Sequence, residues 1–370
     1  MSKKGIFILS RPLSNVLDEG SKNLVYYLCK NSSKNYIVTV EKKFTLQLPQ
    51  NIIKIPFLDD INKNYVESSK SNKVKIFLIK ELFKIQKYET IHVFFTITKI
   101  NALVLLFFNV FFQKKIILSL PVVKSDTIDN YFIKKLLKNS SKIVVMSNYS
   151  KKILNNFENN TINIAPLVDD NKYYPYPLHL KVKLKENLSI NLSSFIIIIP
   201  GEYGRLKMNE NMINIIKHIN KLNKDCLFIL SFRLKNKDDK KTEIEVKKAL
   251  ENCNVLFLNT VNNYHEYCAI SDLAIFPAKS MEGKFDLPLA LVELMAMGIP
   301  VLHSDIAPLN ELYKEKQTFC LPANSTSFSK KIIALLEDEE EYNKSVEITL
   351  NEAERFKPKE VIKKYSKIYE

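Results

Sequence analysis

Short apolar runs alternate with amphipathic segments along the whole chain. In the first half we expect buried strands at residues 5–9, 36–40, 52–55, 91–95, 116–118 and 143–146. Segments with helical periodicity lie between several of these runs, at residues 21–30, 73–87, 100–112, 129–139 and 149–156. Such alternation predicts an α/β fold in which helices cover both faces of a parallel sheet.

The second half repeats this alternation after an irregular segment, APLVDDNKYYPYP (165–177). Its expected strands are 195–199, 227–232, 255–258, 273–277, 301–302 and 319–321, and its expected helices are 209–222, 242–251, 264–271, 325–337 and 358–369. A chain of 370 residues is too long for one ordinary core. We therefore expect two facing Rossmann-like domains, residues 1–180 and 181–355, with a linker that extends to about residue 191 and ligands at the carboxyl ends of the strands.

The stretch EGKFDLPLALVELMAMGIPVLHSDIAPL (282–309) predicts a loop, a helix and a short buried strand. Asp286 is expected to cap the helix, with Leu287 and Pro288 in its first turn. Gly298 suits the left-handed residue at the end of the helix. A loop that leads into a helix offers backbone N–H groups to an anion such as a phosphate, so we expect the chemistry here.

Two acids fall on one face of this predicted helix, Asp286 and Glu293, separated by Ala290. An acid among leucine, methionine and alanine is rarely buried without a partner, which favours a ligand-binding role for Glu293. Asp286 has an equally good structural explanation as a helix cap.

The net charge of +15 is concentrated in the first half of the chain. Residues 1–180 contain 27 lysines and arginines against 13 acids, a net charge of +14. Only four of the 55 basic residues are arginine, which argues against base-specific nucleic-acid binding and against a nucleic-acid partner. An anionic membrane surface or phosphate-linked acceptor and a plain solubilising surface explain the excess equally well.

The composition also limits cofactors and compartment. Five cysteines are scattered without paired spacing, which indicates reduced thiols in the cytoplasm and no zinc site: Cys29, Cys226, Cys253, Cys268 and Cys320. The absence of a D-x-D motif does not favour a tightly bound metal. No apolar run reaches the roughly 20 residues of a membrane span, and the first residues lack a signal-peptide pattern.

Several segments resemble retaining family-4-type glycosyltransferases with the GT-B fold. NVLFLNTVNNYHEYCAISDLAIFPAKS (254–280), followed by FDLPLALVELMAMGIPVLHSDIAPLNEL (285–312), is similar to their donor domain. IVVMSNYSKKIL (143–154), APLVDDNKYYP (165–175) and RFKPKEVIKKYSKIYE (355–370) are similar to the end of the acceptor domain, the segment before the linker and the closing helix. The resemblance extends over the whole chain and implies that the terminal helix, about 356–370, packs back on the first domain.

The resemblance also implies a diphosphate-binding turn after strand 195–199. Gly201 takes the family's glycine position and Lys207 its lysine position. Glu202 stands where the family has an arginine, so Arg205 is expected to substitute for that arginine. Stabilising a departing diphosphate requires such convergent cations.

In the family, two glutamates bind the donor, and Glu293 matches the second, which binds the ribose. Phe285 stands at the spacing of the first, so Asp286 is expected to serve in its place, with Glu282 as the alternative. The backbone amides near Leu287 are expected to contact the diphosphate. Lys207, Arg205 and Asp286 are thus the predicted catalytic residues, and Gly201, Glu282, Phe285, Leu287 and Glu293 the predicted donor-binding residues.

The acceptor side carries weaker signals. Ser119 stands where many members of the family have a catalytic histidine, whereas His92 lies inside an expected strand and suits the core. Gly20 precedes the first expected helix, where either a loop over the substrate or a plain helix start explains it. Without a base, the resemblance implies that a phosphate oxygen of the donor takes the acceptor proton.

The resemblance therefore implies a cytoplasmic retaining glycosyltransferase that needs no metal or other cofactor. Its expected partners are a nucleotide sugar, a glycan or lipid-linked acceptor and, through the basic first domain, the inner-membrane surface. The alternatives are a non-catalytic GT-B-like subunit, suggested by Glu202 and the missing histidine, and a nucleotide-sugar epimerase or phosphorylase.

Overall fold

The computed structural model describes residues 3–17, 19–56, 88–314 and 318–370. Its contacts divide the chain into two compact units, Met1–Leu167 with Val361–Glu370, and Val168–Glu360. The helix predicted at residues 73–87 lies outside the described residues. Within the described part of the chain, no helix has both the length and the apolar character needed to cross a bilayer.

The first unit contains a seven-stranded parallel sheet in the order β3-β2-β1-β4-β5-β6-β7. Isoleucine, valine and leucine line its central strands, as expected where both faces of a sheet are covered. The strands are β1 (Lys3–Leu13), β2 (Tyr36–Val40), β3 (Ile53–Pro56), β4 (Tyr88–Phe94), β5 (Lys115–Leu120), β6 (Lys142–Val145) and β7 (Thr161–Asn163).

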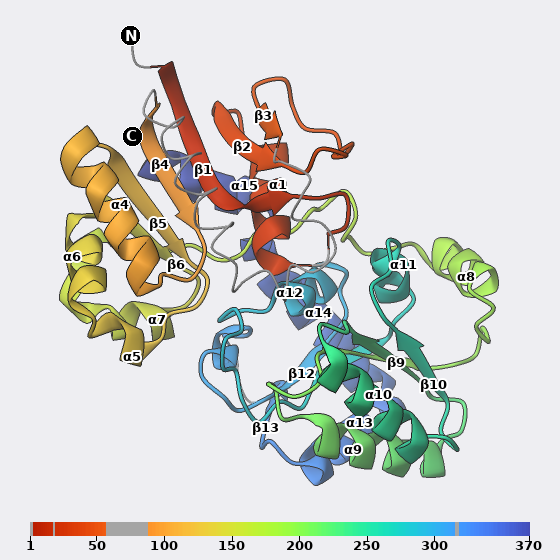
Figure 1. Ribbon diagram of the computed structural model, residues 1–370. Helices are drawn as coiled ribbons and strands as arrows, with labels where there is room; N and C mark the ends of the chain where they lie inside the picture. Colours follow the sequence, from red (N-terminus) through yellow and green to blue (C-terminus); the bar gives the residue numbers. More distant parts are fainter. Residues whose placement is uncertain (1–2, 18, 57–87, 315–317) are drawn as a thin grey trace. The chain divides into compact units, whose positions relative to one another are not determined.

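Side chains of β4 alternate between the two faces of this sheet. Ile91 and Val93 belong to an apolar cluster with residues of α4 and α6, which pack against each other (Figure 1). His92 and Phe94 point the other way and contact Tyr365 of α15. The helices of the unit are α1 (Gly20–Asn31), α4 (Lys99–Phe112), α5 (Ser125–Ile128), α6 (Tyr131–Asn139), α7 (Asn148–Ile153), the 3₁₀ segment η2 (Asn155–Asn160) and α15 (Pro358–Ile368), which begins in the second unit.

The second unit contains a six-stranded parallel sheet in the order β10-β9-β8-β11-β12-β13. Its strands are β8 (Ile196–Gly201), β9 (Leu227–Phe232), β10 (Val255–Leu258), β11 (Leu273–Phe276), β12 (Val301–Ser304) and β13 (Cys320–Leu321). Its helices are α8 (Leu178–Asn187), α9 (Asn209–Leu222), α10 (Lys237–Ala249), α11 (Tyr264–Ala269), α12 (Leu289–Ala296), α13 (Ser325–Glu337), α14 (Glu339–Ala353) and the 3₁₀ segments η3 (Leu309–Glu311) and η5 (Glu354–Phe356).

These findings confirm the predicted fold class, two α/β units that each contain a parallel sheet. Polar caps begin several helices where the sequence changes from polar to periodic: the side chains of Asn236, Asn324 and Asp338 accept backbone N–H groups three residues ahead.

The division between the units lies at Leu167, ahead of the boundary expected at residue 180. The linker expected up to residue 191 contains a helix, α8, which belongs to the second unit. None of the residues of α8 is buried, so it lacks the apolar stripe by which a packed helix is recognised. The first unit takes the chain end only from Val361, later than the expected start near residue 356.

Candidate active site

The predicted site lies at the centre of the second sheet, where the strand order reverses. β8 lies between β9 and β11, and the chain order turns back between β8 and β11. Two loops leave the carboxyl ends of these strands, residues 202–208 and 277–288. They are joined directly, since the N–H groups of Lys279 and Ser280 both donate to the Leu206 carbonyl, at 2.9 and 3.2 Å. A reversal of strand order in an open parallel sheet is the usual place for a ligand.

Gly201 ends β8 at a point with no room for a side chain. A Cβ there would stand 2.7 Å from Cε1 of Phe232 and 3.1 Å from Sδ of Met208. Gly204, with φ of +91°, makes the turn that follows. The family's glycine position therefore serves close packing between neighbouring strands here.

Glu202 is the centre of a buried group of charges. It is 2% exposed, and its Oε2 lies 2.6 Å from Nζ of Lys284 and also pairs with Nζ of Lys235. Nε of Arg205 lies 3.9 Å from Oε1. We call Glu202, Arg205, Lys235 and Lys284 the Glu202 cluster. An acid in this position is therefore compensated by three cations.

This environment shifts the pKa of Lys284. Burial, together with repulsion from Arg205 and Arg233, lowers the pKa of Lys284 to about 8, while Asp239 acts in the opposite direction. The 2.6 Å contact with Glu202 further favours the charged form. At neutral pH the ammonium group is therefore charged but held in a region dense in positive charge.

Sequence reasoning missed Lys235 and Lys284 as site residues. Each follows the carboxyl end of a strand, β9 for Lys235 and β11 for Lys284, and both strands neighbour β8. Because the carboxyl ends of adjacent parallel strands lie at one edge, these positions converge. No local sequence signal marks them, because the strand order that brings them together is set by the tertiary structure.

The two predicted cations occupy different environments. The side chain of Arg205 is 60% exposed. Its guanidinium lies beside Gly283 of the neighbouring loop, where Nη1 would be 3.4 Å from a Cβ atom if residue 283 had one. Lys207 is exposed and adopts a left-handed φ of 49°, with its N–H donating to the Gly204 carbonyl. Among the described residues, no carboxylate lies within ion-pair distance of Lys207. The structure thus places Arg205 in the cluster and Lys207 beside it on the same loop.

The helix after this loop starts later than predicted. α12 begins at Leu289, and Pro288 stands at its N-cap without a side-chain cap, so the prediction that Asp286 caps the helix is wrong. The proline ring fixes φ near the helical value, and proline has no polar side chain that could accept the first N–H groups of the helix. Asp286 is 5% exposed and makes contacts within the fold.

Glu293 lies in the interior of α12 and is 3% exposed. Its carboxylate faces α11, because it contributes, after burial, to raising the pKa values of Tyr264 and Cys268. A buried acid is rarely left without a polar partner, which suits a hydrogen-bonding role toward a polar ligand group. Its function as a ribose ligand stays a prediction.

The remaining predicted donor-binding residues lie on the loop at residues 277–288. Glu282 is exposed and its N–H donates to Oγ of Ser280 at 3.2 Å. Phe285 is half-buried and Leu287 is 2% exposed. The structure therefore brings Glu282, Phe285 and Leu287 to the edge that holds the Glu202 cluster, but it leaves their donor contacts untested.

On the first unit, the expected acceptor residue Ser119 lies in the core. It is 1% exposed at the end of β5, and its Oγ hydrogen-bonds Nε2 of His92 at 2.8 Å. Nδ1 of His92 hydrogen-bonds the Tyr369 hydroxyl at 2.6 Å, and burial lowers the pKa of His92 to about 3. Ser119 is therefore bonded within the core, and its acceptor-side role stays a prediction, whereas the expectation that His92 is a core residue is confirmed.

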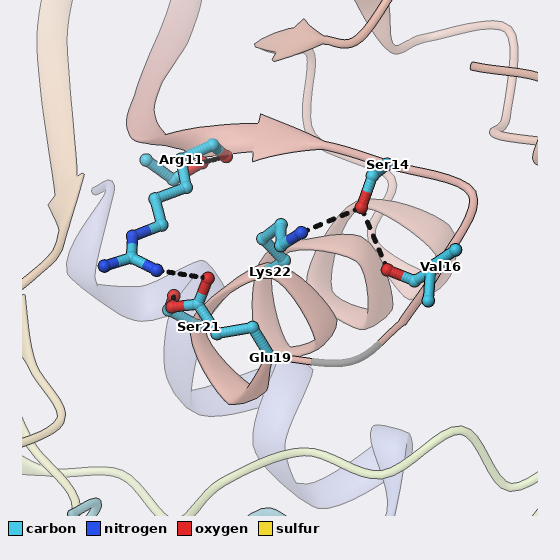
Figure 2. Close-up of polar contacts among 7 residues, drawn as sticks. Arg11, Ser14, Val16, Glu19, Ser21 and Lys22 are labelled. Carbon is cyan, nitrogen blue, oxygen red and sulfur yellow. Dashed lines mark hydrogen bonds and ion pairs between the residues drawn. The ribbon is translucent and has the colours of Figure 1, made fainter. Parts of the chain in front are cut away.

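Gly20 is the first residue of α1. Polar contacts connect the residues before it with the first turn of the helix (Figure 2). Nη1 of Arg11 lies 2.8 Å from Oε2 of Glu19, and Nζ of Lys22 donates to Oγ of Ser14 at 2.9 Å. In Figure 2 these side chains point toward one another across the loop. The loop is therefore held from both ends, and the acceptor-side role of Gly20 stays a prediction.

Comparisons with known proteins bear on the fold of the chain. Residues 181–351 match the family described as glycosyl transferases, group 1, whereas no curated protein matches the chain significantly. HepE from Anabaena, solved with UDP and glucose, has a TM-score of 0.74 at 16% identity over 99% of each chain. Sucrose-phosphate synthase from Thermosynechococcus elongatus has a TM-score of 0.77 at 13% identity, over 99% of this chain and 98% of that one.

A third similar structure is WaaG, a glycosyltransferase involved in lipopolysaccharide biosynthesis, with a TM-score of 0.70 at 11% identity over 98% of this chain and 99% of that one. The family match covers most of the second unit, and the structural likeness extends over nearly the whole chain. The chain therefore has the GT-B fold of glycosyltransferases, and its second unit is similar to the glycosyl transferases group 1 family.

Proposed function

We propose that the protein transfers a sugar from a nucleotide-sugar donor to a glycan or lipid-linked glycan, with retention of configuration, in cell-surface polysaccharide or glycoconjugate synthesis. The observation that carries the proposal is the convergence of Arg205, Lys235 and Lys284 at the carboxyl edge of β8, β9 and β11. Departure of a nucleoside diphosphate builds negative charge that such cations stabilise. HepE, with a similar fold, was solved with UDP and with UDP-glucose.

The donor would lie along the two joined loops. Arg205, Lys207 and the amides near Leu287 would hold the diphosphate, and Glu293 the ribose. Asp286 or Glu282 would hold the sugar hydroxyls. In this proposal the side-chain cations supply the charge neutralisation, and that no resident metal or other cofactor is needed stays a prediction.

The hydrogen bonds and the pKa of His92, which lies near the expected acceptor loop, support a retaining mechanism without a histidine base. Both ring nitrogens of His92 are hydrogen-bonded in the core, and burial lowers its pKa to about 3, so it cannot take a proton from an acceptor near neutral pH. In our proposal a phosphate oxygen of the donor accepts that proton as the acceptor oxygen attacks.

The acceptor is proposed to be presented at an anionic, cytoplasmic membrane face. Helix α4 exposes an apolar face, with exposed fractions from 42% to 70%, made of Ile100, Leu103, Phe107, Val110 and Phe111. We call these residues the α4 face. Lys99, Lys134, Lys135 and Lys138 lie on α4 and on α6, which packs against it. Apolar side chains beside lysines match the chemistry of an anionic lipid surface.

A non-catalytic subunit was suggested by Glu202 and the missing histidine. The ion pairs of Glu202 with Lys235 and Lys284 remove the first of these reasons. An epimerase remains compatible with the same donor contacts, and the fate of the sugar distinguishes it from a transferase.

The test is a thermal-shift panel of UDP-, GDP-, ADP- and CMP-sugars on the wild type, Glu293→Gln and Glu352→Gln. Glu352 is a matched control, an ion-paired acid on α14 outside the site. A donor at a hundredfold excess over its Kd should add about 2.7 kcal/mol to the free energy of unfolding. We expect one nucleotide to stabilise the wild type and Glu352→Gln but not Glu293→Gln; no stabilisation of the wild type by any of them would sink the proposal.

A further inference from the structure

The Glu202 cluster is layered from the interior outward. The Glu202 side chain is 3% exposed, those of Lys235 and Lys284 are 21% and 24% exposed, and that of Arg205 is 60% exposed. The carboxylate therefore lies below the cations, and the side of the cluster nearer to solvent is positive. A ligand that approaches this edge meets ammonium and guanidinium groups before it meets Glu202.

The charges near the cluster do not cancel. Arg205, Lys235, Lys284 and Arg233 contribute four positive charges, while Glu202 and Asp239 contribute two negative charges. The groups around Lys284 therefore carry an excess of positive charge, which suits a diphosphate. Asp239 also accepts the backbone N–H of Lys235 at 2.8 Å, which fixes the start of that side chain.

Two lysines this close to each other and to two arginines repel one another. Burial, followed by repulsion from Arg205 and Arg233, lowers the pKa of Lys284 to about 8. Without a carboxylate between them, the ammonium groups would lose their protons more readily or turn toward solvent. Glu202 opposes both tendencies because one oxygen, Oε2, pairs with both lysines.

We propose that Glu202 is a positioning residue that holds Lys235 and Lys284 charged and directed at the diphosphate of the donor. The inference rests on the proposed function, because it takes the ligand of this edge to be a diphosphate. It departs from simple electrostatics, which would make an acid near an anion site unfavourable. Glu202 acts through the lysines and does not itself contact the ligand.

The two views predict opposite signs for one substitution. If Glu202 only repels the ligand, Glu202→Gln should bind inorganic pyrophosphate and UDP more tightly than the wild type. If Glu202 positions the lysines, Glu202→Gln should bind both more weakly, by about tenfold at pH 8.5 and less at pH 6.5, where the lysines keep their protons more easily. Glu202→Asp should keep part of the affinity, and Glu352→Gln should bind as the wild type does.

A second measurement needs no ligand and reports on the lysines directly. The pH dependence of acetylation of Lys284 by trace acetic anhydride, followed by mass spectrometry, gives the pKa of its ammonium group. The groups that face it are Arg205, Arg233, Lys235, Asp239 and Glu202. We expect Glu202→Gln to move this titration to lower pH. Lys284→Arg in the Glu202→Gln background should reduce the loss of pyrophosphate affinity between about pH 6.5 and pH 8.5 relative to Glu202→Gln alone, since arginine at position 284 stays charged.

The outcomes separate the inference from the function beneath it. Tighter or unchanged pyrophosphate binding by a folded Glu202→Gln variant overturns the positioning role while the nucleotide panel on the wild type still stands. An unchanged Lys284 titration does the same. Absence of nucleotide and pyrophosphate binding by the wild type overturns the proposed function and, with it, the diphosphate to which this inference assigns the lysines.

Discussion

At the scale of single residues, environment decides what a charged or titratable group does. His92 and Glu202 both lie in parallel strands or at their ends, and both are almost fully buried. His92 is surrounded by Phe94, Tyr365 and Tyr369, and burial lowers its pKa, whereas Glu202 is ion-paired with Lys235 and Lys284. The same degree of burial therefore accompanies a neutral imidazole in one unit and an ion-paired carboxylate in the other.

The neutral state of His92 predicts a specific sensitivity to acid. Its pKa is about 3 in the fold and about 6.5 in the unfolded chain, so the folded state binds fewer protons between these values. Stability contributed by His92 is fully present above pH 6.5 and is lost as the pH falls toward 3. At pH 5 this loss should reach about 2 kcal/mol.

The measurement is urea unfolding followed by circular dichroism at pH 7.5 and pH 5. The wild type should lose about 2 kcal/mol more than His92→Gln between these values. His218→Gln, at an exposed position on α9, is the control and should behave as the wild type does. Equal losses for the wild type and His92→Gln would show that His92 is not the group that titrates.

At the scale of elements, α4 differs from the other described helices of its unit because its own residues are apolar on all sides of the helix. Its inner face packs into the core through Ala102, Leu105, Leu106 and Phe108, while the α4 face lies at the surface. A helix that is apolar on all sides normally lies inside a protein or against another apolar phase. The lysines on α4 and α6 make an anionic lipid surface the best match for that phase.

This predicts that the chain binds lipid vesicles through α4. Sedimentation with vesicles that contain phosphatidylglycerol should retain the wild type, and neutral phosphatidylcholine vesicles should retain it less. Phe107→Ser with Phe111→Ser should lower binding about tenfold or more, because both side chains bury apolar area in the lipid.

Matched controls are Leu222→Ser and Ile244→Ser, which remove similarly exposed apolar side chains from α9 and α10. These variants should bind vesicles as the wild type does. Equal binding by the α4 variant would reject the lipid interpretation. A change of oligomeric state on mutation of α4 would instead assign the face to a second copy of the chain.

At the scale of the whole molecule, each unit has its own parallel sheet and its own charge balance. The first unit, residues 1–167 with 361–370, contains 29 lysines and arginines against 12 acids, a net charge of +17. The second unit, which contains the Glu202 cluster, has 26 against 28, a net charge of −2. This division suits a first unit that works next to anionic surfaces and a second unit that binds the donor.

Donor binding should therefore slow hydrogen exchange mainly in the second unit. Hydrogen exchange followed by mass spectrometry, with and without UDP, should show the largest added protection at residues 201–208 and 279–291. These loops lie at the sheet edge and contain exposed residues, so they open more easily than the strands they follow. β9 and β12, already buried, should change little, and protection confined to the first unit would contradict this placement of the donor.

Much of the fold follows from local pattern. β2, β9, β10, α9 and α13 have the predicted bounds, because an element that is apolar on both faces or along one stripe is visible in its own residues. The sequence also directed attention to the two loops that form the candidate site, at Gly201–Lys207 and Glu282–Leu287. Local pattern failed at α8, which has no buried residues, and at Asp286, where Pro288 takes the N-cap instead.

By itself, then, the sequence determined the class of the fold, most of its elements and the loops at which a donor would bind. Only the tertiary structure decided which side chains meet. Lys235 and Lys284 reach Glu202 because β9 and β11 flank β8, and Tyr369 reaches His92 across 277 positions of the chain because α15 returns to the first sheet. Periodicity is a property of neighbouring residues, whereas strand order and helix return are set by burial of the whole core, so no local pattern contains them.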